Sequence, residues 1–375
     1  MNRYLYDPVK TDLLRKMVVL TGPRQIGKTW LAKALMAEFK RPQYLNYDQV
    51  KDAGIIRLQS WPLNADMLVL DEIHKMIGWK MFIKGVYDTR PEQQAILITG
   101  SARLDTFRQT GESLAGRYVH FRLHPISVRE LQTSLKPDEA LAALNRLGGF
   151  PEPFLSGSEA EAARWRNRYY TDLIREDILE FGRLQEIRAM RLLLELLRSR
   201  VGSPLSYTSL AGDLQIAPNT VRRYLDILED LCIIFRVRTF HVNVARAILR
   251  EPKIYFYDTG FVQGDEGVRL ENTCAVCLLK HVQYRQDMAG EDMALHYLRT
   301  RDGKEIDFVL TKDGKATHLI EVKLSDDSPS PALRLFAKKV PEAGACQLVQ
   351  NLRREQQKDG ISILAAGKWL ADLSA

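Results

Sequence analysis

The segment from Gly22 to Thr29 reads Gly-Pro-Arg-Gln-Ile-Gly-Lys-Thr, which fits the pattern G-x-x-x-x-G-K-[ST] of a phosphate-binding loop. An apolar strand pattern at Met17–Leu20 precedes this loop, and a helical pattern at Trp30–Phe39 follows it. The glycines let backbone N–H groups converge on phosphate oxygens, and the helix presents its positive N-terminus to the same anion. This strand–loop–helix order constrains the first part of the chain to an α/β fold.

All eight residues of this loop are predicted to contact a nucleotide. Lys28 would bring a positive charge to the β and γ phosphates of ATP, and the hydroxyl of Thr29 would bind Mg²⁺. The alternative is a chance glycine-rich turn, which the flanking strand and helix disfavour. The predicted phosphate-binding residues are Gly22, Pro23, Arg24, Gln25, Ile26, Gly27, Lys28 and Thr29.

A second motif, Met67 to Glu72, ends an apolar strand in two carboxylates. We expect Asp71 to hold Mg²⁺, directly or through water. We expect Glu72 to act catalytically, because a carboxylate at that point can orient and polarise the attacking water. The alternative is a pair of solvated acids that closes a strand.

Short apolar strands alternate with helical patterns in the first half of the sequence, which predicts a parallel sheet with helices on both faces. One of these strands, Ala95–Thr99, continues into Gly100 and Ser101. Because this end of a parallel strand faces the nucleotide crevice, Ser101 is a candidate catalytic contact to the γ-phosphate or the attacking water. Thr99 is a less favoured candidate, and an ordinary turn residue is the alternative.

Arg117 follows a helical pattern and precedes a strand pattern at Tyr118–Leu123. An arginine in this place can reach the nucleotide of a neighbouring subunit and offset the charge of the transition state. We therefore expect a homo-oligomer in which Arg117 acts in trans. A surface arginine is the alternative, and Arg103 and Arg108 are weaker candidates for the same role.

The middle of the chain has a helix–turn–helix pattern, with helices at 207–214 and 221–231. The stretch that follows, 232–253, is basic and contains a single acid, which is the charge expected of a winged-helix wing that lies on DNA phosphates. Acidic residues on the second helix favour the alternative, a module that packs against protein. The basic residues are Arg236, Arg238, Arg246, Arg250 and Lys253, and the opposing acids are Asp226, Glu229 and Asp230.

Two strand patterns joined by a turn lie near the C-terminus. Asp307 lies on the first strand, and Glu321 and Lys323 lie on one face of the second, because alternate residues of a strand share a face. The two carboxylates would bind Mg²⁺ or Mn²⁺, Lys323 would steady the attacking water, and Glu271 could add a third carboxylate. In the alternative, Lys323 pairs with Glu305 and the cluster is a solvated hairpin.

The chain has 375 residues, a net charge of +7 and four cysteines. This length predicts two or three domains, and the charge is compatible with a nucleic-acid partner without proving one. Cys274 and Cys277 have the spacing C-x-x-C, but a helical pattern without a second pair predicts core cysteines. With no leader pattern and no apolar run long enough to span a membrane, we expect a cytoplasmic protein without membrane contact.

These motifs carry a resemblance to a known family. Residues 1–135 resemble the AAA+ superfamily through the segments LTGPRQIGKTWLAKAL, LVLDEIHKM, LITGSARL and LAGRYVHFRLHPIS. With GGFPEPFL, nearly the whole chain resembles bacterial and archaeal ATP-binding proteins that join an AAA module to a C-terminal domain of unknown function. In that family the C-terminal domain is placed in the restriction-endonuclease-like superfamily, and Asp307, Glu321 and Lys323 resemble its PD-(D/E)XK motif.

Motifs and resemblance together predict four parts: an AAA+ P-loop ATPase at 1–135, a helical lid or linker at 136–185, a winged helix-turn-helix at 186–250 and an α/β restriction-endonuclease-like domain at 251–375. We expect an ATPase that uses ATP and Mg²⁺, assembles as a homo-oligomeric ring and acts on DNA as a motor or switch, with a metal-dependent nuclease as its C-terminal domain. The alternative is a regulatory ATPase whose C-terminal half is a non-catalytic protein-interaction or oligomerisation module.

Overall fold

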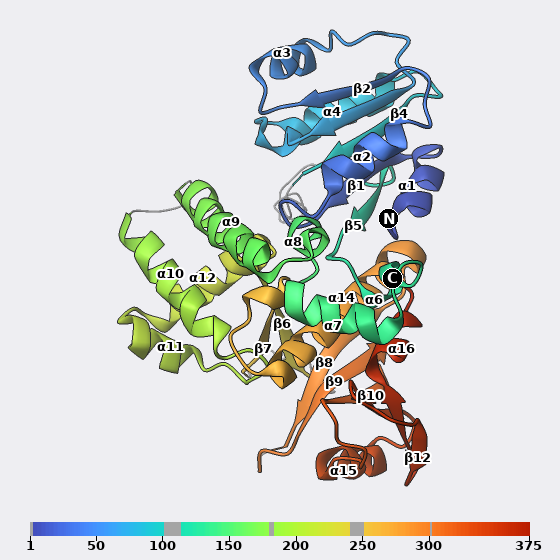
Figure 1. Ribbon diagram of the computed structural model, residues 1–375. Helices are drawn as coiled ribbons and strands as arrows, with labels where there is room; N and C mark the ends of the chain where they lie inside the picture. Colours follow the sequence, from blue (N-terminus) through green and yellow to red (C-terminus); the bar gives the residue numbers. More distant parts are fainter. Residues whose placement is uncertain (1–2, 101–113, 180–183, 241–250, 301) are drawn as a thin grey trace. The chain divides into compact units, whose positions relative to one another are not determined.

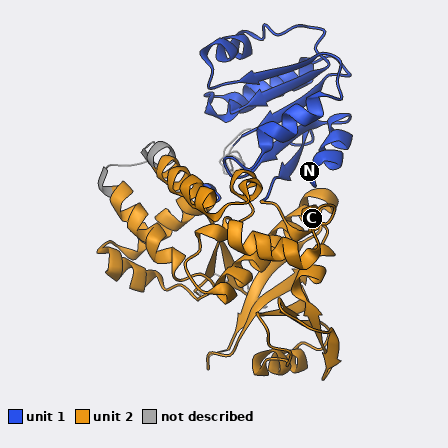
Figure 2. Cartoon of the chain, viewed as in Figure 1, with its two compact units in different colours: residues 1–124, 230–232 blue, residues 125–229, 233–375 orange. Residues whose placement is uncertain are grey.

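A computed structural model describes residues 3–100, 114–179, 184–240, 251–300 and 302–375. The chain divides into two compact units, which Figure 2 shows in different colours. The first unit contains Met1–His124 and Asp230–Cys232, and the second contains Pro125–Glu229 and Ile233–Ala375. Within the described ranges, no helix has both the length and the apolar character that crossing a membrane requires.

The first unit is built on a five-stranded parallel sheet with the strand order β2-β3-β4-β1-β5 (Figure 1). Its three central strands are buried along their whole length, as parallel strands covered on both faces should be. The expected parallel sheet is therefore confirmed. In chain order the elements are α1 Tyr6–Leu13, β1 Met17–Thr21, α2 Lys28–Met36, β2 Pro42–Asn46, α3 Val50–Leu58, β3 Met67–Asp71, η1 Ile73–Lys75, α4 Trp79–Thr89, β4 Ala95–Thr99 and β5 Tyr118–Arg122.

The order of the strands separates the two motifs of the first unit by one strand. The phosphate-binding loop follows β1 and the Asp71 motif ends β3, while β4 lies between them. Thr99, the last residue of β4, is in register with Leu20 of β1 on one side and with Asp71 of β3 on the other. The same edge of the sheet therefore carries the loop, Thr99 and the two carboxylates.

The second unit begins with helices and continues into a large mixed sheet (Figure 1). Three of its helices, α10 to α12, precede an antiparallel hairpin of β6 and β7. The predicted helix–turn–helix is present as α11 and α12. The helices are α6 Val128–Leu131, α7 Pro137–Leu147, α8 Pro151–Ser156, α9 Glu159–Leu179, α10 Leu184–Arg198, α11 Tyr207–Leu214 and α12 Pro218–Asp230.

The mixed sheet has eight strands in the order β12-β13-β11-β10-β9-β8-β6-β7. The hairpin of β6 and β7 joins this sheet because β6 pairs in parallel with β8. The described parts of the basic stretch expected to form a wing, β6 and Lys253 of β7, therefore belong to one sheet with the C-terminal strands. The remaining elements are β6 Ile234–Thr239, β7 Lys253–Phe256, η3 Thr259–Phe261, α14 Glu266–Ala289, β8 Met293–Arg299, β9 Glu305–Lys312, β10 Lys315–Lys323, α15 Pro331–Lys339, β11 Gly344–Val349, β12 Gln356–Lys358, β13 Ile361–Ala365 and α16 Ala366–Ala371.

A tight turn joins β9 to β10, as the sequence predicts. Lys312 and Lys315 pair across the hairpin, and the two residues between them have φ of 51° at Asp313 and 72° at Gly314. Two consecutive positive φ values define the turn that matches the twist of a two-residue hairpin, and Asp-Gly is a preferred sequence for it. The turn starts the pairing of β9 with β10, and a bulge between Ala316 and His318 then shifts the register by one residue. The shifted register pairs Ile320 with Phe308, so the next residues, Glu321 and Asp307, lie beside each other.

A buried ion pair ties α9 to the segment after β7. The guanidinium of Arg166 donates to both carboxylate oxygens of Asp258 at 2.7 and 3.2 Å and also to the carbonyl oxygen of Leu147. The side chain of Asp258 is fully buried, and it also accepts from the backbone N–H of Gly260 at 3.1 Å. The carboxylate has no exposure to water and the guanidinium has very little, so each charge depends mainly on the other for its stabilisation.

We predict that Arg166→Met lowers the free energy of unfolding by about 3–5 kcal/mol, because it leaves the carboxylate of Asp258 buried and unpaired. Arg200→Met is the matched control, since the pair between Arg200 and Asp213 is partly exposed and should contribute less than about 1 kcal/mol. Denaturant unfolding of the two variants measures the difference. Equal losses in both would show that the buried pair is not a special contributor.

Candidate functional site

Both glycines of the phosphate-binding loop have backbone conformations that other residues rarely adopt. Gly22 has φ of 148°, and a Cβ atom at this position would lie 2.3 Å from the carbonyl oxygen of Leu123. Gly27 has φ of 99° and is the N-cap of α2. The loop therefore passes close to the strand edge and enters the helix in a left-handed conformation, which turns its N–H groups toward an anion.

Lys28 points its ammonium group into this loop. Its Nζ donates to the carbonyl oxygens of Gly22 at 2.9 Å and Pro23 at 2.7 Å, and the residue is buried. Burial lowers the pKa of Lys28 to about 8, although the carboxylates of Glu72 and Asp71 oppose the shift. A polyphosphate within the loop would supply the negative charge that this desolvated ammonium lacks.

Three hydroxyl groups hold the carboxylate of Asp71. Thr99 Oγ1 donates to Oδ1 at 2.5 Å, whereas Tyr44 OH at 2.5 Å and Thr29 Oγ1 at 3.2 Å both donate to Oδ2. The donors come from β4, β2 and α2, and the carboxylate is buried. Tyr44 was not anticipated, because nothing in the local pattern of β2 shows that it lies beside β3.

The hydroxyl of Thr29 and the carboxylate of Asp71 are the kinds of oxygen ligand that Mg²⁺ prefers, and they lie in direct contact. The glycine loop and Lys28 lie next to them on the same edge of the sheet. This set of side chains therefore fits a magnesium-bound nucleotide polyphosphate.

Glu72 has a strained backbone, with φ of 57° and ψ of 22° in the left-handed region. Its N–H donates to the carbonyl oxygen of Thr99 at 3.0 Å, which turns the chain sharply at the end of β3. The carboxylate lies 3.6 Å from Nε2 of His74 and 3.8 Å from Nζ of Lys75. Burial raises the pKa of Glu72 above its usual range, while Lys75 acts in the opposite direction.

The arginine and serine candidates differ in what the structure describes. Ser101, Arg103 and Arg108 lie outside the described residues. Arg117 precedes β5, and its carbonyl oxygen accepts from the N–H of Met17 at 3.3 Å, at the start of β1. Because the phosphate-binding loop follows the opposite end of β1, Arg117 lies at the far edge of the sheet, where its guanidinium binds Asp88 at 2.7 and 3.0 Å. From there it does not reach the nucleotide edge of its own sheet.

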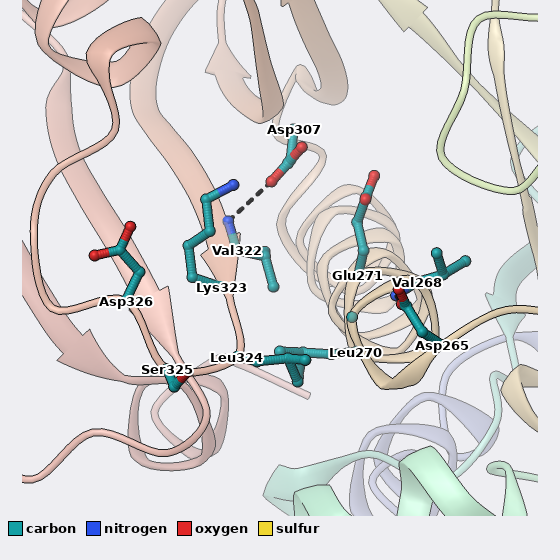
Figure 3. A pocket seen from close by; sticks show the side chains of 11 residues that line it. Asp265, Val268, Leu270, Glu271, Asp307, Val322, Lys323, Leu324, Ser325 and Asp326 are labelled. Atoms are coloured by element: carbon teal, nitrogen blue, oxygen red, sulfur yellow. Dashed lines mark hydrogen bonds between the residues drawn. The ribbon is translucent and has the colours of Figure 1, made fainter.

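A second candidate site lies in the C-terminal sheet. The β9–β10 register pairs Ile320 with Phe308, which brings the next residues, Glu321 and Asp307, beside each other. Asp307 Oδ2 accepts from the N–H of Val322 at 2.9 Å (Figure 3). Lys323 Nζ pairs with Glu321 Oε1 at 2.8 Å. A pocket of about 410 Å³ adjoins this cluster and is lined by Asp265, Gly267, Val268, Leu270, Glu271, Asp307, Val322, Lys323, Leu324, Ser325 and Asp326.

Lys253 is part of this cluster, although the sequence analysis counted it among the basic residues of a predicted wing. Its Nζ lies 2.6 Å from Glu305 Oε1, 3.3 Å from Glu271 Oε1 and 3.7 Å from Asp307 Oδ1. The expectation that Lys253 lies on DNA phosphates is wrong, because its side chain is 1% exposed. The sequence did contain a signal for burial, because Lys253 begins a strand whose other residues are apolar or aromatic, Lys253–Phe256.

Other expectations for the basic stretch are also corrected. Arg236 of β6 is mostly buried and pairs with Asp226 and Glu229 of α12, so its side chain faces that helix. Arg246 and Arg250 lie outside the described residues. The alternative in which Lys323 pairs with Glu305 is wrong, because Glu305 binds Lys253 and Arg299 while Lys323 binds Glu321.

The carboxylates of the C-terminal cluster are electrostatically strained. Burial, and then the nearby charge of Asp307, raises the pKa of Glu271 and of Glu321 above the usual range. Glu321 Oε2 is buried and has no hydrogen-bond partner among the described residues. A buried carboxylate oxygen without a partner fits a hard cation, which would bind it directly. In the described ranges, however, no three acid, histidine or cysteine side chains converge closely enough to hold a metal by themselves.

Comparison with known proteins defines the class of the first unit. Residues 14–132 match the family model described as AAA domain, so the chain contains an AAA-type P-loop ATPase domain, whose cofactor is ATP. Residues 138–267 and 266–369 match two models described as domains of unknown function, DUF8612 and DUF4143.

Two relatives that match most of this chain are each described as an uncharacterized protein. One from Mycobacterium tuberculosis is 28% identical over 332 residues, which cover 85% of this chain and 73% of the relative. One from Haemophilus influenzae is 22% identical over 355 residues, which cover 85% of this chain and 84% of the relative. Among solved structures, a Walker-type ATPase of Pyrococcus abyssi is 16% identical, with a TM-score of 0.46 over 70% of this chain and 94% of that one.

Proposed function

We propose that the first unit binds ATP with Mg²⁺ and hydrolyses it, with Glu72 as the group that activates water. The observation that carries this proposal is the buried Asp71 carboxylate, which contacts Thr29 and lies on the same sheet edge as the loop that holds Lys28. In this scheme the loop and Lys28 bind the phosphates, while Thr29 and Asp71 hold the metal. Ser101 remains a proposed contact to the γ-phosphate.

The position of Glu72 supports its role. Glu72 directly follows Asp71, at the turn that ends β3. Burial raises the pKa of its carboxyl group above the usual range, so the group accepts a proton more readily than an exposed glutamate does. A base near the metal can accept a proton from water as the oxygen attacks phosphorus. Asp71, in contrast, is held in place by hydroxyl donors and contacts Thr29, the other proposed metal ligand, so it is positioned to hold the ion and not to take up a proton.

We predict that Lys28→Ala abolishes nucleotide binding, whereas Glu72→Gln retains binding and slows turnover by on the order of 10²-fold or more. The reason is that the two side chains act on different parts of the reaction, phosphate binding and water activation. ATP affinity and phosphate release are measured separately. Wild-type turnover in Glu72→Gln would exclude Glu72 as the base.

We propose further that the active ATPase is a homo-oligomer in which Arg117 acts on the nucleotide of a neighbour. Support comes from its place at the edge of the sheet away from its own nucleotide site, and from its exposed pair with Asp88, which is weak enough to exchange. An arginine that acts in trans can contribute about 10³-fold or more to turnover.

Mixing subunits tests this assignment. Arg117→Ala subunits retain an intact nucleotide site, and Lys28→Ala subunits retain the arginine, so mixed oligomers should recover part of the activity that each variant lacks alone. Phosphate release is followed after mixing, with the mixed assembly verified by differential tagging. Verified mixed oligomers without recovery would rule out Arg117.

A second candidate function concerns the C-terminal part, which we propose to be a restriction-endonuclease-like domain that cleaves phosphodiesters with a metal. The order α14, β8, β9, β10, α15 and β11 supports it, with three antiparallel strands followed by a helix and a strand parallel to β10. In the same way, α10 to α12 and the β6–β7 hairpin support a winged helix upstream. The specific observation in favour is the partnerless oxygen of Glu321 beside Asp307.

In this proposal Asp307 and Glu321 would hold Mg²⁺ or Mn²⁺ together with water molecules, with Glu271 as the third nearby carboxylate, and the ion when bound lowers the pKa of such a water molecule. Lys323 reaches from β10 into the pocket and would steady the hydroxide by its positive charge (Figure 3). Glu321 already holds Lys323 in place through their ion pair. DNA is the proposed substrate, and the net charge of +7 supports a polyanionic partner.

We predict Mg²⁺- or Mn²⁺-dependent cleavage of linear or single-stranded DNA by the wild type and its loss in Asp307→Ala. The variant removes one of the carboxylates and leaves the ATPase domain unchanged, so ATP turnover serves as the control. Cleavage products are followed by gel electrophoresis, with and without ATP. Absence of cleavage by the wild type under all these conditions would favour the other reading, a regulatory ATPase whose C-terminal half only binds a partner.

A further inference from the structure

An ammonium group is built into the acidic cluster of the C-terminal sheet. Lys253 comes from β7, which lies at the edge of the sheet next to β6, whereas its three carboxylate partners come from α14 and β9. Its side chain is 1% exposed, and its Nζ also lies 5.6 Å from the ring of Tyr297. A lysine buried to this extent persists only where its charge is compensated, and here carboxylates from two elements provide that compensation.

The charges of the cluster can be counted from these contacts. Four carboxylates, those of Glu271, Glu305, Asp307 and Glu321, face the ammonium groups of Lys253 and Lys323, and Glu305 also pairs with the partly exposed guanidinium of Arg299. When all are ionised, one negative charge remains, which favours the binding of a cation. Without Lys253 the cluster would carry two, and its carboxylates would repel one another more strongly.

The contacts of Lys253 also decide which oxygens remain for a metal. Lys253 takes Oε1 of Glu271 and Oδ1 of Asp307. Oδ2 of Asp307 accepts from the backbone of Val322, while Oε2 of Glu321 has no hydrogen-bond partner among the described residues. Lys253 and Glu321 do not line the pocket, whereas Asp307, Glu271 and Lys323 do. The ammonium of Lys253 thus lies away from the pocket, and an exchangeable ion would enter from the pocket side, beside Asp307 and Glu271.

We propose that Lys253 is a fixed cation of the C-terminal site: it takes the place of a second metal ion, so the cluster binds one exchangeable divalent cation on its pocket side. The proposal rests on the metal-dependent function proposed above and specifies the number of ions. Lys253 is a positioning residue, because it orients Glu271 and Asp307 without reaching the pocket. Tyr255 supports the same arrangement, since its hydroxyl donates to Glu271 Oε1 at 2.6 Å.

The experiment is a Mn²⁺ titration of the full chain without nucleotide, followed by electron paramagnetic resonance of the free ion. Asp307→Asn identifies binding to the cluster, because sites elsewhere persist in that variant. The wild type should bind one Asp307-dependent Mn²⁺. Lys253→Met, which keeps an unbranched side chain one atom shorter and removes its charge, should bind a second ion, or bind the first at least about tenfold more tightly.

Two further variants keep the result interpretable. Lys253→Met leaves a buried surplus of negative charge, so Lys253→Met/Glu305→Gln restores the net charge by neutralising the nearest partner, which does not line the pocket. This double variant should fold like the wild type and still gain the second ion, because Glu271 and Asp307 regain their free oxygens. Lys312→Met, which removes a partly exposed lysine from the far end of β9, should leave Mn²⁺ binding unchanged.

The outcomes separate the role of Lys253 from the metal site itself. If no variant shows Asp307-dependent Mn²⁺ binding, the metal-dependent function fails and the proposal fails with it. If the wild type binds one ion and both Lys253 variants bind one ion with the same affinity, the metal site stands and the role of Lys253 is overturned. Binding of two Asp307-dependent ions by the wild type would also overturn the proposal, because Lys253 would then not take the place of a second metal ion.

Discussion

The carboxylate of Asp71 is the point on which the first unit depends, because hydroxyl groups from three separate elements converge on it. This convergence is possible only in the observed strand order, where β4 separates the loop-bearing strand from β3 and brings Thr99 between them. A parallel sheet places all of its functional side chains at one edge, so the phosphate-binding loop and the acid motif meet although about forty residues of chain separate them.

The second unit depends on buried charge in a different way. Arg166 with Asp258, and Lys253 with its carboxylates, are ion pairs whose members come from distant parts of the sequence. The first pair fixes α9 against the segment after β7, and the second fixes β7 against α14 and β9. A buried charge that moves away from its partner loses its stabilisation, so these contacts restrict the relative positions of the elements. Lys253 holds β7 against α14 and β9 in this way, and β6 and β7, which follow the helix–turn–helix, belong to the same sheet as the strands of the C-terminal cluster.

Much of the fold could be predicted because its signals are local. The strands of the first unit, the helices α11 and α12 and the Asp313–Gly314 turn lie where periodicity and turn chemistry indicate. The candidate site was predicted in part. Lys28, Thr29 and Asp71 lie together as expected, but Tyr44 was not anticipated, and Lys253 was expected on the surface. The roles of Glu72, Arg117 and the C-terminal carboxylates stay predictions.

The sequence by itself determined the phosphate-binding loop, because Gly22 and Gly27 stand where the backbone takes conformations that residues with a side chain rarely adopt. It also determined that Glu321 and Lys323 share a face, since a strand repeats every two residues. Only the tertiary structure decided that Tyr44 reaches Asp71 and that Lys253 enters the acidic cluster. Both depend on which strands are neighbours, and the pairing of strands is set by the packing of the whole sheet, which no local pattern of residues encodes.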